Sequence, residues 1–458
     1  MLRNALIICL VFVLSIAAQD HSKFIKGPFN TPQDVTKKCL ECHDNVADDI
    51  LSSRHWKWLG EVIETGPYKG KSLGKINLIN NFCIAVSSNE ARCTSCHIGY
   101  GWKDDTFDFT NAENIDCLVC HEQTGKYVKA PTKAGMPADG VDLLASAKSV
   151  STPTRTNCGS CHFDGGGGAG VKHGDLDDSL YDPSPELDVH MGGLGFTCED
   201  CHSDPGSHHI KGASHASMAA GEKSFTCESC HKGEVHEKSI LNRHMKTVAC
   251  ETCHIPEFAR EEPTKVWWDW SKAGEDRENE TGEFDKETYD KKKGEFKWAK
   301  DVVPTYVWYN GSADYYMMGD KVDGEIVKLN SPNGSMDDPN SKIYPFKLMK
   351  GKQPYDPVNK ILIVPNLFGD NGYWKTFDWV SASEIGMKSA GLEFSGKVDF
   401  VETEMYWPIN HMVAPAEDAV KCIECHGVKE GKRINLRAMG YGEDPMKSGG
   451  RFKNGSVE

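Results

Sequence analysis

Cys227-Glu-Ser-Cys230-His231 and Cys250-Glu-Thr-Cys253-His254 lie close together in this chain, and the pattern Cys-x-x-Cys-His that they share decides its fold. The pattern occurs eight times and uses 16 of the 18 cysteines. It is the attachment signature of c-type haem, in which two thiols form thioethers with the haem and the next histidine binds the iron. The sequence therefore predicts eight covalently bound haem c groups.

The motif residues have two predicted roles, haem attachment for the cysteines and proximal iron ligation for the histidines. The attachment cysteines are Cys39, Cys42, Cys93, Cys96, Cys117, Cys120, Cys158, Cys161, Cys198, Cys201, Cys227, Cys230, Cys250, Cys253, Cys422 and Cys425. The proximal histidines are His43, His97, His121, His162, His202, His231, His254 and His426. A lone Cys-x-x-Cys would also suit half a zinc site or a redox-active dithiol. Neither alternative explains a histidine at the fifth position of every copy.

The spacing of the motifs bears on the fold and on the division of the chain. Seven motifs lie within residues 39–254, at steps too short for each to form a domain, so the haems should replace most of the hydrophobic core. We expect a mainly α structure with much irregular loop, wrapped around a closely packed haem cluster. The expected regions are a signal peptide at 1–18, a seven-haem region at 19–258, a charged and loop-rich insertion with few short strands at 259–377, and a helical C-terminal region with the eighth haem at 378–458.

The N-terminus and the net charge indicate where the protein works. Arg3 precedes an apolar run that ends at Ala18, which is shorter than the roughly 20 residues of a membrane span and is typical of a signal peptide. We expect a periplasmic or otherwise exported protein with no integral membrane segment in the mature chain, an uncleaved anchor being the alternative. The net charge of −15 disfavours nucleic acid and anionic membranes as partners. An anionic substrate would need a local basic patch.

Ten histidines lie outside the motifs, and they nearly match the number of distal ligand places. We expect His21, beside the signal cleavage region, to be idle. His208 and His209 are adjacent and should serve one place between them, which we assign to His209. The predicted distal ligands are His55, His173, His190, His209, His215, His236, His244 and His411. A solvent-exposed histidine is the alternative for each.

His55 illustrates why ligands should come from distant parts of the chain. Thr31-Pro32 has the form of a helix start, and Val46 and Ile50 follow at helical spacing. If one helix continues through His55, that residue lies roughly 18 Å from His43, at 1.5 Å per residue. His55 would then bind a different haem from His43 or lie on the surface.

Two further segments are candidates for chemistry. Cys83, in Asn80-Asn81-Phe82-Cys83, is the one cysteine of the expected mature chain outside the motifs. Such a thiol is reactive or is an inert buried cysteine, and the residues alone leave both open. The glycine-rich run at 165–170 precedes Lys172-His173, whose neighbouring side chains diverge and can reach two haems. A flexible linker is the alternative.

With these motifs the chain resembles the octahaem tetrathionate reductases, relatives of octahaem hydroxylamine oxidoreductases and pentahaem nitrite reductases. The resemblance covers about residues 31–430 and includes Asn80-Asn81-Phe82-Cys83 and Val171-Lys172-His173-Gly174-Asp175. It implies a multihaem cytochrome c fold and an active haem on Cys93, Cys96 and His97. It also implies Lys172 as the distal ligand of this haem and Cys83 beside it, so that Cys83, Lys172 and His97 are the predicted catalytic residues.

The expected function is a haem-dependent reductase of a small inorganic oxyanion, tetrathionate first, with nitrite or hydroxylamine as rivals. A thiolate can attack a sulfur–sulfur bond, and a neutral lysine amine is more easily displaced from iron than imidazole. Lys69, Lys71 and Lys75 either attract the anion or form a solvated surface. A redox protein or a quinol-linked cytochrome would donate electrons. The alternative is a non-catalytic electron conduit, which would need neither Lys172 nor Cys83.

Overall fold

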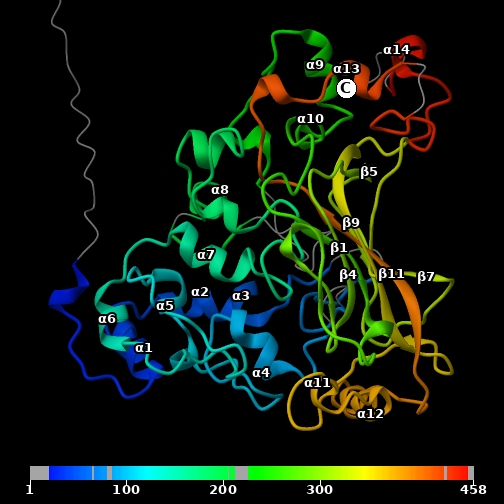
Figure 1. Cartoon of the computed structure of the whole chain (residues 1–458). Coiled ribbons are helices and arrows are strands. Elements are labelled where there is room, and N and C mark those ends of the chain that lie inside the picture. Colours follow the sequence, from blue (N-terminus) through cyan, green and yellow to red (C-terminus); the bar gives the residue numbers. More distant parts are fainter. Residues whose placement is uncertain are drawn as a thin grey trace, which may run out of the picture.

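The computed structural model describes residues 20–63, 67–79, 85–204, 206–211, 225–427 and 431–451. Its helices are short. Those within residues 32–202 lie on one side of a β-sheet, those within 373–389 lie beneath the sheet, and the remaining helices lie at its other end (Figure 1). The expected signal peptide, Cys83 and His215 lie outside the described residues. No helix among the residues described is long and apolar enough to cross a membrane.

The α-helices mostly have one or two turns. They are α1 Pro32–Leu40, α2 Val46–Ser52, α3 Arg54–Lys57, α4 Glu90–Cys93, α5 Leu118–His121, α6 Leu143–Lys148, α7 Arg155–His162, α8 Glu199–His202, α9 Ser239–His244, α10 Cys250–His254, α11 Tyr373–Thr376, α12 Trp379–Ser389, α13 Cys422–Cys425 and α14 Pro445–Ser448. Most of them carry a Cys-x-x-Cys-His motif or a histidine. Their role is to present ligands, and they form no helical bundle.

The strands account for much of the second half of the chain. They are β1 Thr264–Asp269, β2 Glu280–Thr281, β3 Glu287–Asp290, β4 Gly294–Ala299, β5 Thr305–Tyr309, β6 Ala313–Tyr315, β7 Ile326–Lys328, β8 Asn330–Pro332, β9 Lys342–Asp356, β10 Ile361–Leu362 and β11 Asp399–Pro408. Nine of them form one sheet in the order β2-β3-β4-β1-β9-β11-β7, with β5 and β10 also paired to β9. The prediction of a mainly α structure is therefore not confirmed.

Strand β9 is the centre of this sheet and shows why the sequence concealed it. It pairs antiparallel with β11 along ten residues and parallel with β1 at Trp267 and Lys350. Its buried positions include Lys347 and Gln353, so the apolar alternation typical of a half-buried strand is absent. The region 259–377 accordingly has far more strand than the few short strands expected from its Gly, Pro, Asn and Asp content.

The sheet also provides a hydrophobic core that the chain was not expected to need. Trp268, Phe296, Met349 and Trp407 lie in one buried cluster drawn from β1, β4, β9 and β11. Burying such side chains contributes about 1.5–3 kcal/mol each before the conformational entropy is subtracted. Residues after 378, expected to be helical, contribute α12 and α13 but also the ten-residue strand β11.

The first helix begins as predicted but ends early. The Thr31 side chain accepts a hydrogen bond from the Asp34 backbone, and the Asp34 side chain accepts one from the Thr31 backbone. The two bonds form a capping box at the start of α1. The helix ends at Leu40, and α2 and α3 follow as separate pieces, so the single helix through His55 is wrong. Asp44 and Asn45 stand at the break, and short polar side chains of this kind favour turns.

Candidate functional site

Seven of the eight motif histidines face a second histidine. The ring centroids of each pair are 6.0–6.4 Å apart. The pairs are His43 with His21, His162 with His55, His121 with His208, His231 with His190, His202 with His411, His254 with His236, and His426 with His244. Two imidazoles on opposite sides of one metal ion, each with a metal–nitrogen bond of about 2 Å, have centroids roughly 6 Å apart. The separations therefore fit a six-coordinate haem iron between the rings.

The nitrogen atoms of these rings are oriented for the same purpose. In several pairs Nδ1 lies within hydrogen-bond distance of an oxygen, which leaves Nε2 available for a metal. The distances are 2.9 Å from His121 to Ser151 O, 2.7 Å from His202 to Lys211 O, 3.2 Å from His236 to Asn242 Oδ1, 2.8 Å from His244 to Ile240 O, 3.1 Å from His411 to Asp175 Oδ2 and 2.7 Å from His426 to Asp444 Oδ1. Burial lowers the pKa of His162 to about 3, which favours the neutral imidazole that binds metals.

The motif cysteines show how close the attachment points of different haems lie. Side chains of cysteines from different motifs lie next to one another. The contacts are Cys39 with Cys117, Cys96 with Cys161, Cys158 with Cys198, and Cys227 with Cys250. Porphyrins attached at such neighbouring points lie close together, as a shared electron pathway requires.

His97 differs from the other motif histidines. Its ring is fully buried, and the rings around it among the described residues belong to tryptophan and phenylalanine. Trp102 and Trp56 are nearest, with centroids 4.8 and 5.1 Å away. Its Nε2 lies 2.6 Å from Trp56 O, whereas Nδ1 is buried with no hydrogen-bond partner in the described part of the chain, which is the reverse of the arrangement in the histidine pairs. Burial lowers its pKa to about 3, so this imidazole is neutral, and a metal at Nε2 would have to replace the contact with Trp56 O.

Lys172 lies beneath the glycine-rich loop, close to the second and fourth motifs. Its side chain is 8% exposed and packs on Gly165 and Gly166, where added Cβ atoms would lie 3.9 Å from Cδ and 2.7 Å from Cγ. The same position on Gly165 is 3.8 Å from Cys161 O, and the thiol of Cys161 contacts that of Cys96. Lys172 therefore lies in the neighbourhood of Cys161, whose thiol contacts Cys96 of the motif that contains His97. A side chain at Gly166 would collide with Lys172, whereas the contacts at Gly165 are of ordinary length.

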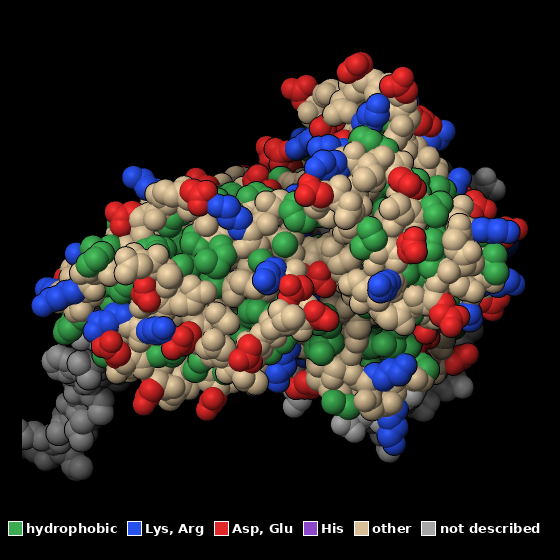
Figure 2. Space-filling model, turned by 90° about the horizontal axis from the view of Figure 1, so that it is seen from below, with side chains coloured by type: hydrophobic (Ala, Val, Ile, Leu, Met, Phe, Trp, Pro, Cys, Tyr) green, Lys and Arg blue, Asp and Glu red, His purple; other side chains and the backbone are tan. Residues whose placement is uncertain are grey.

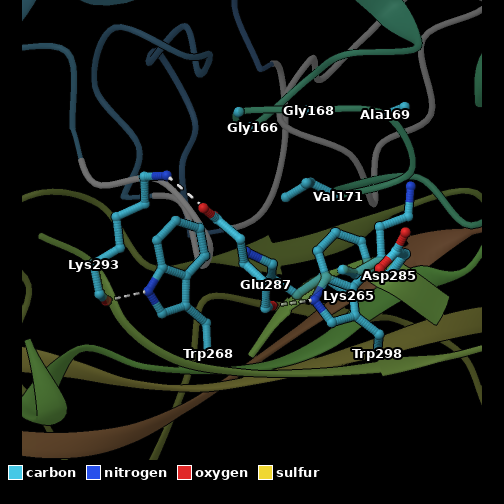
Figure 3. Close-up of a pocket in the computed structure, with 12 residues that line it drawn as sticks. Gly166, Gly168, Ala169, Val171, Lys265, Trp268, Asp285, Glu287, Lys293 and Trp298 are labelled. Carbon is cyan, nitrogen blue, oxygen red and sulfur yellow. Dashed lines mark hydrogen bonds and ion pairs between the residues drawn. The ribbon is translucent and has the colours of Figure 1, made fainter. Parts of the chain in front are cut away.

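A cavity of about 240 Å³ lies on the loop beside these glycines. Figure 3 shows Gly166, Gly168 and Ala169 along one wall, opposite Trp268 and Trp298. Its lysines have partners, since Lys286 Nζ is 3.2 Å from Glu262 and Lys293 Nζ is 4.0 Å from Glu287. This cavity consequently has no strong excess of positive charge.

The basic residues proposed to attract an anion fall in different places. Lys69 and Lys71 are exposed, whereas Lys75 Nζ is 4.0 Å above the Trp58 ring, which packs against His97. The face in Figure 2 carries acidic and basic side chains intermixed. A buried lysine that the sequence did not single out, Lys129, forms a 3.0 Å ion pair with Asp116 and donates to His97 O.

Some of the predicted distal histidines face a motif histidine, and others do not. His55, His190, His236, His244 and His411 each face one. His173 instead packs on Trp407 at 4.6 Å, and His209 Nε2 lies 3.2 Å from Ser52 Oγ. His21 and His208 take the places by His43 and His121. The prediction that His21 is idle rested on its position beside the expected signal cleavage region. The number of spare histidines alone would have allowed His21 as a distal ligand.

Comparisons with known proteins agree with this geometry. The chain matches the family models "Cytochrome c7 and related cytochrome c" at residues 184–255 and "Cytochrome c bacterial" at residues 265–429. It is 48% identical to the octahaem cytochrome c of Shewanella oneidensis, whose crystal structure superposes with a TM-score of 0.88 and covers 94% of this chain and 98% of that one. It is also 27% identical to an uncharacterized protein of Archaeoglobus fulgidus, over 40% of this chain and 78% of that protein.

Proposed function

This chain belongs to the octahaem tetrathionate reductase family of multihaem c-type cytochromes, and from that premise we propose that it reduces tetrathionate to thiosulfate at the site of His97 and Lys172. It carries eight covalently bound haem c groups, one for each Cys-x-x-Cys-His motif. We propose further that seven irons are held by the histidine pairs and that these haems only relay electrons.

The observation that carries the proposal is the difference at His97. Seven motif histidines have an imidazole opposite them, whereas in the described residues His97 has none, and the buried Lys172 lies by Cys161, whose thiol contacts Cys96 of the same motif. An amine binds iron only when it is neutral, and burial favours the neutral form. A weaker distal ligand at one site among eight marks that site for substrate.

Cys83 supplies the proposed nucleophile. Its thiolate attacks the central sulfur–sulfur bond of tetrathionate, so that Cys83 retains one S–SO₃⁻ unit and one thiosulfate leaves. Two electrons then reduce the new disulfide bond. This step releases the second thiosulfate and restores the Cys83 thiolate. The haem groups supply these electrons one at a time. Lys75, which lies over the Trp58 ring, and Lys129, which donates to His97 O, are cations near His97 that would favour an anionic substrate.

The test compares the wild-type holoprotein with Lys172→Ala by low-temperature EPR of the oxidised state. Reduction of tetrathionate, nitrite and hydroxylamine is measured in parallel. We expect one haem to change its ligand signature, seven to keep theirs, and tetrathionate turnover to change most. Faster turnover of nitrite or hydroxylamine would name a different substrate for the same site.

An unchanged spectrum in Lys172→Ala, without reduction of any of the three compounds by either protein, would leave an electron conduit as the function. Cys83→Ser separates the roles of the two residues. It should abolish tetrathionate reduction while the EPR signature of the lysine-bearing site persists. Nitrite and hydroxylamine reduction, which need no thiol, should survive in that variant if they occur at this haem.

A further inference from the structure

The segment that carries Lys172 is held against the β-sheet. Thr264 at the start of β1 donates from Oγ1 to Gly170 O at 2.6 Å, and Lys347 in the adjacent strand β9 donates to this segment as well. Further along, Asp175 accepts hydrogen bonds from the backbone of Asn410 at 2.7 Å and of His411 at 3.0 Å. The segment from 170 to 175 is thus held by residues at the start of β1, within β9 and just after the end of β11.

Lys347 is the most unusual member of this arrangement. Its side chain is 0% exposed in the middle of the sheet. Its Nζ lies 3.1 Å from Val171 O and 2.8 Å from Lys172 O, and it also contacts Thr264 Oγ1. Both carbonyls belong to the peptide units that flank Lys172 itself.

The directions of these hydrogen bonds indicate the form of Lys347. The Thr264 hydroxyl uses its proton on Gly170 O, so it accepts from Lys347. Two carbonyls and this hydroxyl therefore accept the three protons of an ammonium group. Burial lowers the pKa of Lys347, and the nearby Asp175 carboxylate opposes that effect. A buried cation is retained in such a place only when all its donors are satisfied.

We propose that Lys347 is a positioning residue for the distal ligand. Its ammonium group fixes the carbonyls on both sides of the Lys172 α-carbon, and so it determines where the Lys172 side chain leaves the backbone. The glycines of the loop then pack over that side chain from the other side. The proposal rests on the proposed role of Lys172 as the ligand at the His97 site.

The test replaces Lys347 with methionine, which has nearly the same length and no donor. Lys350→Met is the matched control, because Lys350 lies in the same strand, is exposed and pairs with Glu404 at 3.5 Å. In the oxidised holoprotein we expect Lys347→Met to lose most of the EPR signal of the lysine-bearing haem. The seven signals of the histidine pairs should remain, and tetrathionate turnover should fall by about tenfold or more, since misplacement by 1 Å can cost a hundredfold. The Lys350→Met protein should match wild type.

A second variant keeps the test decisive if Lys347→Met yields no haem-loaded protein. Thr264→Val removes one acceptor with little change in shape, and it should weaken the same single signal in part. Retention of that signal at full strength in Thr264→Val and in any folded Lys347→Met would overturn the proposal. Lys172→Ala separates the two hypotheses. If it alters a haem that Lys347→Met and Thr264→Val leave intact, only the positioning role fails; if it alters none, the ligand assignment fails.

Discussion

Replacing Gly166 with alanine should displace the Lys172 side chain without touching any haem attachment residue. The added Cβ would lie 2.7 Å from Lys172 Cγ, 2.9 Å from Cε and 3.2 Å from Cδ. Non-bonded carbon atoms rest about 3.5–4.0 Å apart, so the lysine stem must move by roughly 0.8 Å or more. A shift of this size at a catalytic group lowers the rate by about tenfold to a hundredfold.

Gly167 provides the matched control. Gly166 and Gly167 both have positive φ, +86° and +108°, and alanine at either should lower the free energy of unfolding by about 1–2 kcal/mol. A Cβ on Gly167 meets nothing within 4 Å. The two variants therefore share backbone strain and differ in the contact with Lys172.

The assay is EPR of the oxidised holoproteins, followed by tetrathionate reduction with an artificial electron donor. Gly166→Ala should change the signal of one haem and lower turnover, whereas Gly167→Ala should lower only the temperature of unfolding. Wild-type spectra and wild-type rates in both variants would refute the placement of Lys172 at the active haem. A loss shared by both would assign the effect to loop strain.

Three further predictions concern other residues. His208→Ala should remove one low-spin histidine-pair signal, because the His208 ring is 6.4 Å from that of His121, and His209→Ala should remove none; the opposite result would reverse the pairing. Asp444→Asn should raise the reduction potential of the haem at His426, because a carboxylate 2.7 Å from Nδ1 makes the imidazole a stronger donor; spectroscopic redox titration measures this, and an unchanged potential contradicts it. Burial raises the pKa of Asp177 to about 6, so its ionised form destabilises the fold above that pH. Asp177→Asn should consequently increase the unfolding temperature more at about pH 8 than at about pH 5, and an equal gain at both would rule out this cause.

The haem sites were largely predictable because their signal is local. Each motif places both thiols and one imidazole within five residues, and no tertiary information is needed to recognise it. The partner of each motif histidine was harder to predict, since His208 lies 87 positions after His121 and pairs with it only through the fold. Between adjacent His208 and His209 no sequence pattern decides, and the structure selects the first.

The sheet was not predictable for a different reason. Its central strand β9 buries polar side chains and contains Pro345, Gly351 and Pro354, all of which weaken a strand pattern. Lys347 reads as a surface residue in the sequence, yet it is fully buried because its donors meet backbone carbonyls from residues 171 and 172. The sheet and the role of Lys347 were therefore missed for the same reason, because buried polar residues such as Lys347 disguise strand β9 in the sequence.

The two kinds of site also require different support. An imidazole is rigid, and one local oxygen can orient it, as Ile240 O does for His244 four residues later in the same helix. A lysine has four rotatable bonds in its side chain, so its amine stays in one position only if both the backbone and the stem are held. The sheet holds the backbone through Lys347 and Thr264, and the glycine loop holds the stem. Substitutions in the sheet should therefore alter the lysine-bearing site and spare the histidine pairs.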